Sequence, residues 1–219
     1  MFIKLIFLTF DQRKTMPNSI NHKLPVTSKI PTVVSLFAWT MIFAGPAIFL
    51  HEFGHYMAGV AFGEDVRMTV SSVVSDTKAS DYPPLQRVIQ TGAGPLVSII
   101  LTLLGLIILK HRRNVGAALA IAAPARFVFS VGFLGVLLYR QFAGLPPPSP
   151  SFDEFTVMTA VGLPVWPLLL AELAFLIFVG IRVNKALPAT KKWLCWLALL
   201  TGTVAGGFLW LNVVGALLF

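Results

Sequence analysis

The chain has 219 residues, of which 56% are hydrophobic and only 12% are charged. A soluble globular domain usually has about 25% charged residues, so the composition excludes an ordinary water-soluble protein and indicates one that lies mostly in lipid. The net charge of +8 does not require a nucleic-acid partner, because basic residues of membrane proteins gather in cytoplasmic loops.

The first 32 residues are expected to form a basic cytoplasmic segment ahead of a polytopic membrane domain over residues 33–219. Residues 1–10 are apolar but too short to span a bilayer, which takes about 20 residues. No small-residue cleavage site precedes the charges that follow, so a signal peptide is not predicted. The sequence leaves open whether translation starts at Met1 or at Met16.

Five apolar segments are each long enough to be considered as membrane spans. Each is bounded by charged or proline-rich sequence. The fold class predicted from them is an all-α integral membrane protein. The five spans are expected near residues 33–60, 92–109, 115–138, 164–181 and 193–219.

The basic residues predict the orientation of these spans. Of the 17 Lys and Arg, twelve lie before the first span, between the second and third, or between the fourth and fifth. Four lie in the remaining loops, and Arg126 lies inside the third span. The positive-inside rule therefore places the N-terminus in the cytoplasm and the C-terminus outside, as an odd number of spans requires.

Two polar segments fall on the predicted outer side. Within the polar residues 64–90, apolar and polar side chains alternate over residues 66–70, which predicts a short strand or hairpin. Farther along, Ser151 and Glu154 match a capping box. They predict a short interfacial helix over residues 152–161.

The first span carries an HExxH motif made by His51, Glu52 and His55. Residues 51 and 55 are four apart, so on a helix they project from one face and their neutral imidazoles can bind one Zn²⁺. Glu52 is then placed beside the water as the expected general base. Ionisable groups inside a span cost about 2.5–3.5 kcal/mol each on insertion scales and usually mark function, so a purely structural role is disfavoured.

The sequence here resembles the site-2 proteases, intramembrane zinc metalloproteases of peptidase family M50 that cut membrane-embedded substrates. The resemblance rests on His-Glu-Phe-Gly-His at residues 51–55 and on Gly-Ala-Gly-Pro-Leu at residues 92–96, which is similar to a segment that opens a later span in the family. It implies that His51 and His55 bind Zn²⁺, that Glu52 is the general base and that a membrane-embedded Asp completes the site. It also implies a strand-forming loop that guides the substrate.

The chain departs from the family in its third ligand. The family's Asp precedes a Gly, and no Asp-Gly pair occurs anywhere in this sequence. The best substitute is Asp153, on the predicted outer side, toward which the HExxH end of the first span points; Glu154 and Asp81 are the alternatives. An acidic residue in a first helical turn also favours the helix dipole, so a capping role for Asp153 stays open. The predicted orientation of the HExxH helix is the reverse of that in well-known members.

Three further polar residues lie inside predicted spans. Arg126 and Glu172 fall on adjacent antiparallel helices, where a buried ion pair is favoured over a catalytic role. Asn212 is expected to hydrogen-bond between helices rather than to bind metal.

The leading functional expectation is a zinc-dependent endopeptidase that cuts peptide bonds in or near membrane-spanning segments. Its expected partners are membrane lipid and a membrane-protein substrate, with no nucleic acid. A non-catalytic relative that acts as a regulator or scaffold is the main alternative, favoured by the missing Asp-Gly pair. A metal-binding or transport protein is the weaker one. Family habit suggests a bacterial plasma membrane, and the sequence predicts neither the cleavage site nor the oligomeric state.

Overall fold

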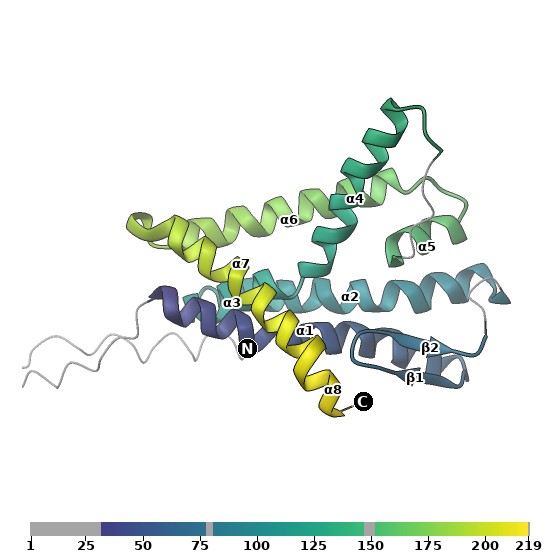
Figure 1. Cartoon of the computed structure of the whole chain (residues 1–219), viewed down its shortest axis with the longest axis horizontal. Helices are drawn as coiled ribbons and strands as arrows, with labels where there is room; N and C mark the ends of the chain where they lie inside the picture. The colour runs from purple at the N-terminus through teal and green to yellow at the C-terminus, as the bar shows by residue number, and fades with distance from the viewer. Residues whose placement is uncertain (1–31, 78–80, 147–151, 219) are drawn as a thin grey trace, which may run out of the picture. The chain divides into compact units, whose positions relative to one another are not determined.

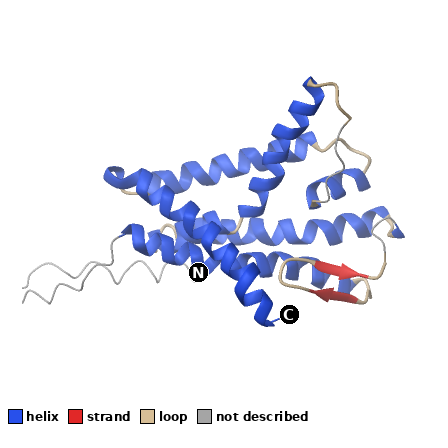
Figure 2. Ribbon diagram, viewed as in Figure 1, coloured by secondary structure: helices blue, strands red, loops and turns tan. Residues whose placement is uncertain are grey.

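The computed structural model describes residues 32–77, 81–146 and 152–218, and helices dominate this part of the chain (Figure 2). The elements in chain order are α1 (Thr32–Ala61), β1 (Val66–Met68), β2 (Val73–Ser75), α2 (Pro84–Ile108), α3 (Arg113–Ala122), α4 (Ala125–Phe142), α5 (Asp153–Ala160), α6 (Trp166–Ala186), η2 (Ala189–Lys191), α7 (Lys192–Leu209), η3 (Trp210–Val214) and α8 (Gly215–Leu218) (Figure 1).

Five helical segments of the described residues are long and apolar enough to cross a membrane. Many of their large apolar side chains are exposed, among them Phe129, Phe142 and Val204. Water penalises such a surface, whereas lipid tails do not. The predicted class, an all-α multi-pass membrane protein, is therefore confirmed. The five segments are Thr32–Ala61, Pro84–Ile108, Ala125–Phe142, Trp166–Ala186 and Ala189–Leu217.

The prediction of one continuous third span over residues 115–138 is wrong. This stretch forms two helices, α3 and α4, which meet at Pro124. Pro124 is the N-cap of α4, with a ψ of 14° that departs from helical geometry, and its missing backbone N–H fits the start of a helix. The membrane-crossing helix is α4 alone, and it runs on to Phe142.

Helix α3 lies at the centre of the helix packing, against α1, α2, α6 and α7. Half of its ten residues are alanine or glycine, and its residues 116–120 are all buried. Such small side chains let neighbouring helix backbones approach closely, as membrane helices require. Together with Leu36 of α1 and Leu199 of α7, its alanines form the larger apolar core cluster.

A short antiparallel hairpin follows α1, as the alternation in the sequence predicted. Gly63 ends the helix with a φ of 77°, a left-handed conformation that glycine adopts without steric cost. Strands β1 and β2 then pair with Val66 opposite Ser75 and Met68 opposite Val73. Both strands lie beside the C-terminal part of α1, which carries the HExxH motif.

The short helix expected over residues 152–161 is also present, as α5, and Asp153 is its first residue. Phe152 is the N-cap and makes no side-chain capping bond. Ser151, the predicted cap, lies outside the described residues, as does the expected N-terminal segment up to residue 31.

Asn212 does not join two helices, contrary to the prediction. Its amide donates to the carbonyl of Phe208, one turn earlier, at 3.0 Å, and the side chain is exposed. The contact between the C-terminal helix and the hairpin comes instead from Trp210, whose indole N–H donates to the carbonyl of Val70 at 3.2 Å.

Candidate metal centre

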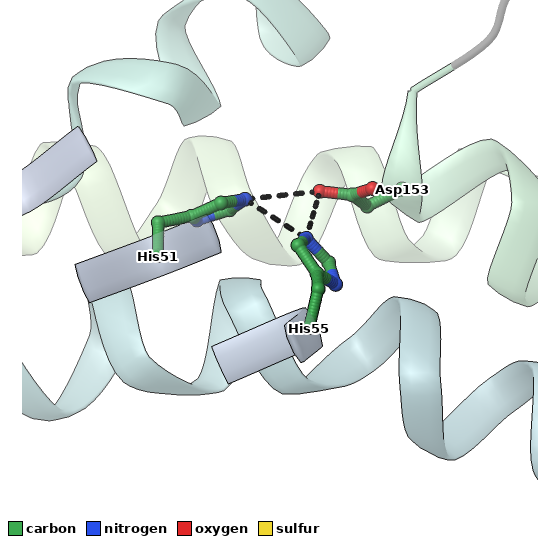
Figure 3. A group of neighbouring side chains, drawn as sticks. All are labelled: His51, His55 and Asp153. Atoms are coloured by element: carbon green, nitrogen blue, oxygen red, sulfur yellow. Dashed lines mark hydrogen bonds and ion pairs between the residues drawn. The ribbon is translucent and has the colours of Figure 1, made fainter. Parts of the chain in front are cut away.

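His51, His55 and Asp153 converge on one point (Figure 3). The two histidines project from the same face of α1 because four residues make about one helical turn. Asp153 comes from the first turn of α5, 102 residues after His51. His51 is only 1% exposed, so the point lies inside the protein. Three side chains of types that bind transition metals therefore meet at one point, His51 buried and the other two partly buried.

The separations of the three potential ligand atoms fit a tetrahedral metal ion. Nε2 of His51 and Nε2 of His55 are 3.2 Å apart. Oδ2 of Asp153 lies 3.1 Å from the first and 3.3 Å from the second. Ligands about 2.0–2.1 Å from a tetrahedral ion lie about 3.3–3.4 Å from one another, which is close to these values. This agreement comes from side chains of two helices far apart in sequence.

Both imidazoles are held by hydrogen bonds at their other ring nitrogen. Nδ1 of His55 donates to the carbonyl oxygen of Gln90 at 2.8 Å. Nδ1 of His51 lies 2.9 Å from the hydroxyl of Ser98, which can accept the same kind of bond. Donation from Nδ1 leaves the lone pair on Nε2, the atom that faces the other ligands. Such outer partners fix the tautomer and orientation of metal-binding histidines.

Gly94 leaves the space in which a metal ion would lie. A Cβ atom at this position would lie 2.3 Å from Nε2 of His55 and 2.8 Å from Nε2 of His51. Any larger residue on this turn of α2 would therefore displace the imidazoles or fill the position between them. The Gly-Ala-Gly-Pro-Leu segment singled out in the sequence thus lies directly against the HExxH helix.

Asp153 is ionised in this arrangement. Its burial alone would raise the pKa of the carboxyl, but the hydrogen bonds to His51 and His55 outweigh burial and hold the pKa well below its usual range. A carboxylate is the form that binds metal. The two alternative third ligands, Glu154 and Asp81, are not in the group of potential ligands that the described residues form.

Glu52 lies beside the two histidines and contacts Arg126 of α4. The carboxylate is 3% exposed, so it needs a charged partner. The predicted ion pair between Arg126 and Glu172 is therefore wrong, because the arginine pairs with the HExxH glutamate instead. The sequence analysis did not predict this contact. The signal for it was that two acidic residues, Glu52 and Glu172, lie in other spans and that either could pair with Arg126.

Glu172 interacts with a different set of groups. It accepts a hydrogen bond from the hydroxyl of Ser130 at 2.7 Å. A further hydrogen bond joins its carboxyl group to that of Glu154 on α5. One of the two carboxyl groups must carry the proton that this bond requires. The pair links α5, and with it Asp153, to the membrane helix α6.

A cleft of about 380 Å³ opens next to the metal centre. Glu52, His55 and Asp153 line it from α1 and α5, and the hairpin contributes further lining residues. On its wall the carboxylate of Glu64 accepts hydrogen bonds from Tyr82 at 2.5 Å, from Gln86 at 2.5 Å and from the side chain of Gln90. Sequence analysis missed Glu64, which lies in a polar loop and belongs to no motif.

Comparisons with protein families, with curated proteins and with solved structures found no match to this chain.

Proposed function

We propose that the chain is a zinc-dependent endopeptidase that hydrolyses peptide bonds in or beside membrane-spanning segments. The single observation that carries the proposal is the set of 3.1–3.3 Å separations among the ligand atoms of His51, His55 and Asp153, with the carboxylate of Glu52 next to them. The resemblance of residues 51–55 and 92–96 to the site-2 proteases supports the same reading. Asp153 would stand where those proteases have the Asp of an Asp-Gly pair.

The chemistry divides between the ion and the side chains. Zn²⁺ held by these three residues would supply Lewis acidity, which ionises water near neutral pH and polarises a peptide carbonyl. Glu52 accepts a proton from the attacking water and later donates it to the leaving amine. Arg126 holds the Glu52 carboxylate in position. The cleft gives water and an extended peptide access to a centre that is otherwise enclosed by apolar helices.

Zinc content and peptide cleavage together test the proposal. Wild-type protein in detergent should bind about one zinc ion, as a site with three protein ligands does. Both His55→Ala and Asp153→Ala should lose it. Glu52→Gln should keep zinc and lose cleavage of a reporter transmembrane peptide. Wild-type protein that binds no zinc even after zinc is added back would contradict the proposal, and zinc retained in Asp153→Ala would remove Asp153 from the site.

A second candidate is a non-catalytic relative that kept the metal site and acts as a regulator or scaffold. The contact of Arg126 with Glu52 favours it, because the guanidinium already occupies one oxygen of the carboxylate that would have to accept a proton from water. The absence of an Asp-Gly pair points the same way. Stoichiometric zinc with no cleavage in wild type or in Glu52→Gln is the result that would select it.

A further inference from the structure

A second cavity, of about 440 Å³, lies between α1, α4, α6 and α7. Its walls are apolar side chains, among them Ile48, Phe129, Val179 and Phe208. Of the described residues that line it, Arg126 alone is charged. This cavity is distinct from the metal centre and from the cleft described above.

The apolar cavity adjoins the metal centre at two residues. Arg126 lines both this cavity and the cleft, and its guanidinium contacts Glu52. Ser98 also lines the apolar cavity, and its hydroxyl lies 2.9 Å from Nδ1 of His51. The side chain of Arg126 therefore forms part of the wall between the cleft beside the metal centre and the apolar cavity.

The cavity also reaches the exposed apolar surface of the membrane-spanning helices. Phe129 of α4 is 81% exposed and Val204 of α7 is 73% exposed, and both line the cavity. A chain that lies in the bilayer can therefore enter the cavity between these helices without crossing water.

We infer that this cavity receives a large apolar side chain next to the scissile bond, so that the substrates are segments with a Phe- or Leu-like residue at the cleavage site. The inference rests on the proposed function, because it assumes a peptide bound at the metal centre. The volume is roughly three times the 150 Å³ that holds a benzene molecule, so a full aromatic side chain fits.

Charge favours a peptide over a lipid headgroup as the occupant of the part of the cavity next to Arg126. Arg126 is already neutralised there by Glu52, so the pair as a whole carries no net charge to attract an anionic headgroup. The unused N–H groups of a guanidinium suit a neutral carbonyl, which a peptide backbone brings beside each of its side chains.

Gly207 of α7 offers a way to fill the cavity without disturbing the metal centre. It lines the cavity, and the nearest atom to a Cβ built there is Cδ1 of Ile48 at 3.8 Å, an ordinary contact. Gly180 of α6 is the matched control. A Cβ there meets nothing within 4 Å, and the residue does not line the cavity. Gly207→Leu and Gly180→Leu add the same side chain to a membrane helix in two places.

Binding of hydroxamates provides the test, since they bind zinc and can carry a chosen side chain. For zinc-loaded wild type, a phenylalanine hydroxamate should bind about 10- to 100-fold more tightly than an alanine hydroxamate, because an apolar side chain is buried. Gly207→Leu should abolish this ratio and Gly180→Leu should keep it. Acetohydroxamate, which has no such side chain, should bind all three proteins equally.

The outcomes separate the two proposals. If acetohydroxamate fails to bind wild type, the metal site fails and the inference falls with it. If acetohydroxamate binds but the phenylalanine-to-alanine ratio is near one, or is unchanged in Gly207→Leu, the inference is overturned while the metal site stands. A phospholipid that copurifies with wild type and is lost in Gly207→Leu, with the hydroxamate ratio unchanged, would assign the cavity to lipid instead.

Discussion

Arg126 contacts the carboxylate of Glu52 across 74 residues of sequence, and this contact joins α4 to the HExxH helix. The glutamate is buried and the guanidinium is partly exposed to the cleft. The contact leaves the carboxylate with a single fixed partner, next to the two histidines. The arginine therefore fixes the direction of the proposed general base.

Replacing Arg126 should lower turnover and leave the metal in place. We expect Arg126→Gln to reduce kcat by about 10- to 100-fold, a part of the roughly 10²- to 10⁴-fold that general-base catalysis contributes. Arg126→Lys should recover part of this loss, since it restores the charge but not the forked geometry. Zinc content and kcat are measured together. Arg140→Gln, at the far end of α4, is the control and should change neither; a normal kcat in Arg126→Gln would contradict the role.

Gly94 should be indispensable for metal binding. A methyl group there would lie within 2.8 Å of both Nε2 atoms, so Gly94→Ala should lose zinc while the protein stays folded. Gly92→Ala is the matched control on the same helix, because a Cβ at that position meets nothing within 4 Å. Zinc is measured by elemental analysis and folding by circular dichroism. Full zinc occupancy in folded Gly94→Ala would show that the ion lies elsewhere.

The hydroxyl of Ser98 should contribute to zinc affinity through His51. Ser98→Ala removes the partner of Nδ1, and loss of such an outer-sphere bond typically costs about 10- to 100-fold in metal affinity. Competition with a chelator of known affinity measures the change. Thr102→Ala removes another fully buried hydroxyl from the same helix, one that bonds only the carbonyl of Ser98, and should leave zinc affinity unchanged. Equal losses in the two variants would contradict the prediction.

The hydrogen bond between Glu154 and Glu172 should hold α5 in place. Glu154→Ala leaves the buried carboxyl of Glu172 with one partner fewer, at a cost of about 1–3 kcal/mol. The melting temperature of Glu154→Ala in detergent and its zinc affinity should both fall, because α5 carries Asp153. The amide of Glu154→Gln can still form a hydrogen bond with Glu172, so this variant should lose less of each. The same loss in both variants would show that the side chain's volume, rather than its hydrogen bond, matters.

Removal of zinc should destabilise the wild-type protein selectively. A ligand that binds only the folded state adds stability in proportion to RT ln(1 + [L]/Kd), so a chelator should lower the melting temperature of wild type. His55→Ala lacks one of the three proposed metal ligands, so its melting temperature should not drop in this way. The measurement is a thermal melt in detergent with and without chelator, and an equal drop in both proteins would point to an effect of the chelator itself.

Short-range features of the sequence were enough to predict the membrane class, the hairpin and the helix that carries the HExxH motif. Each of these depends on local features: runs of apolar residues, alternation over a few residues, and the four-residue spacing of His51 and His55. Secondary structure obeys such short-range rules, so it can be inferred without knowing what packs against what. The break at Pro124 was also local, and the prediction missed it because hydropathy alone is continuous across it.

Which groups distant in sequence meet depends on the tertiary structure. Asp153 was one of three candidate carboxylates, and the packing of α5 brings it rather than Glu154 or Asp81 to the histidines. Arg126 had two acidic residues within possible reach, and the position of α4 selects Glu52. Choices of this kind depend on helix positions that are set by the whole core, including the small residues of α3, and no local pattern encodes them.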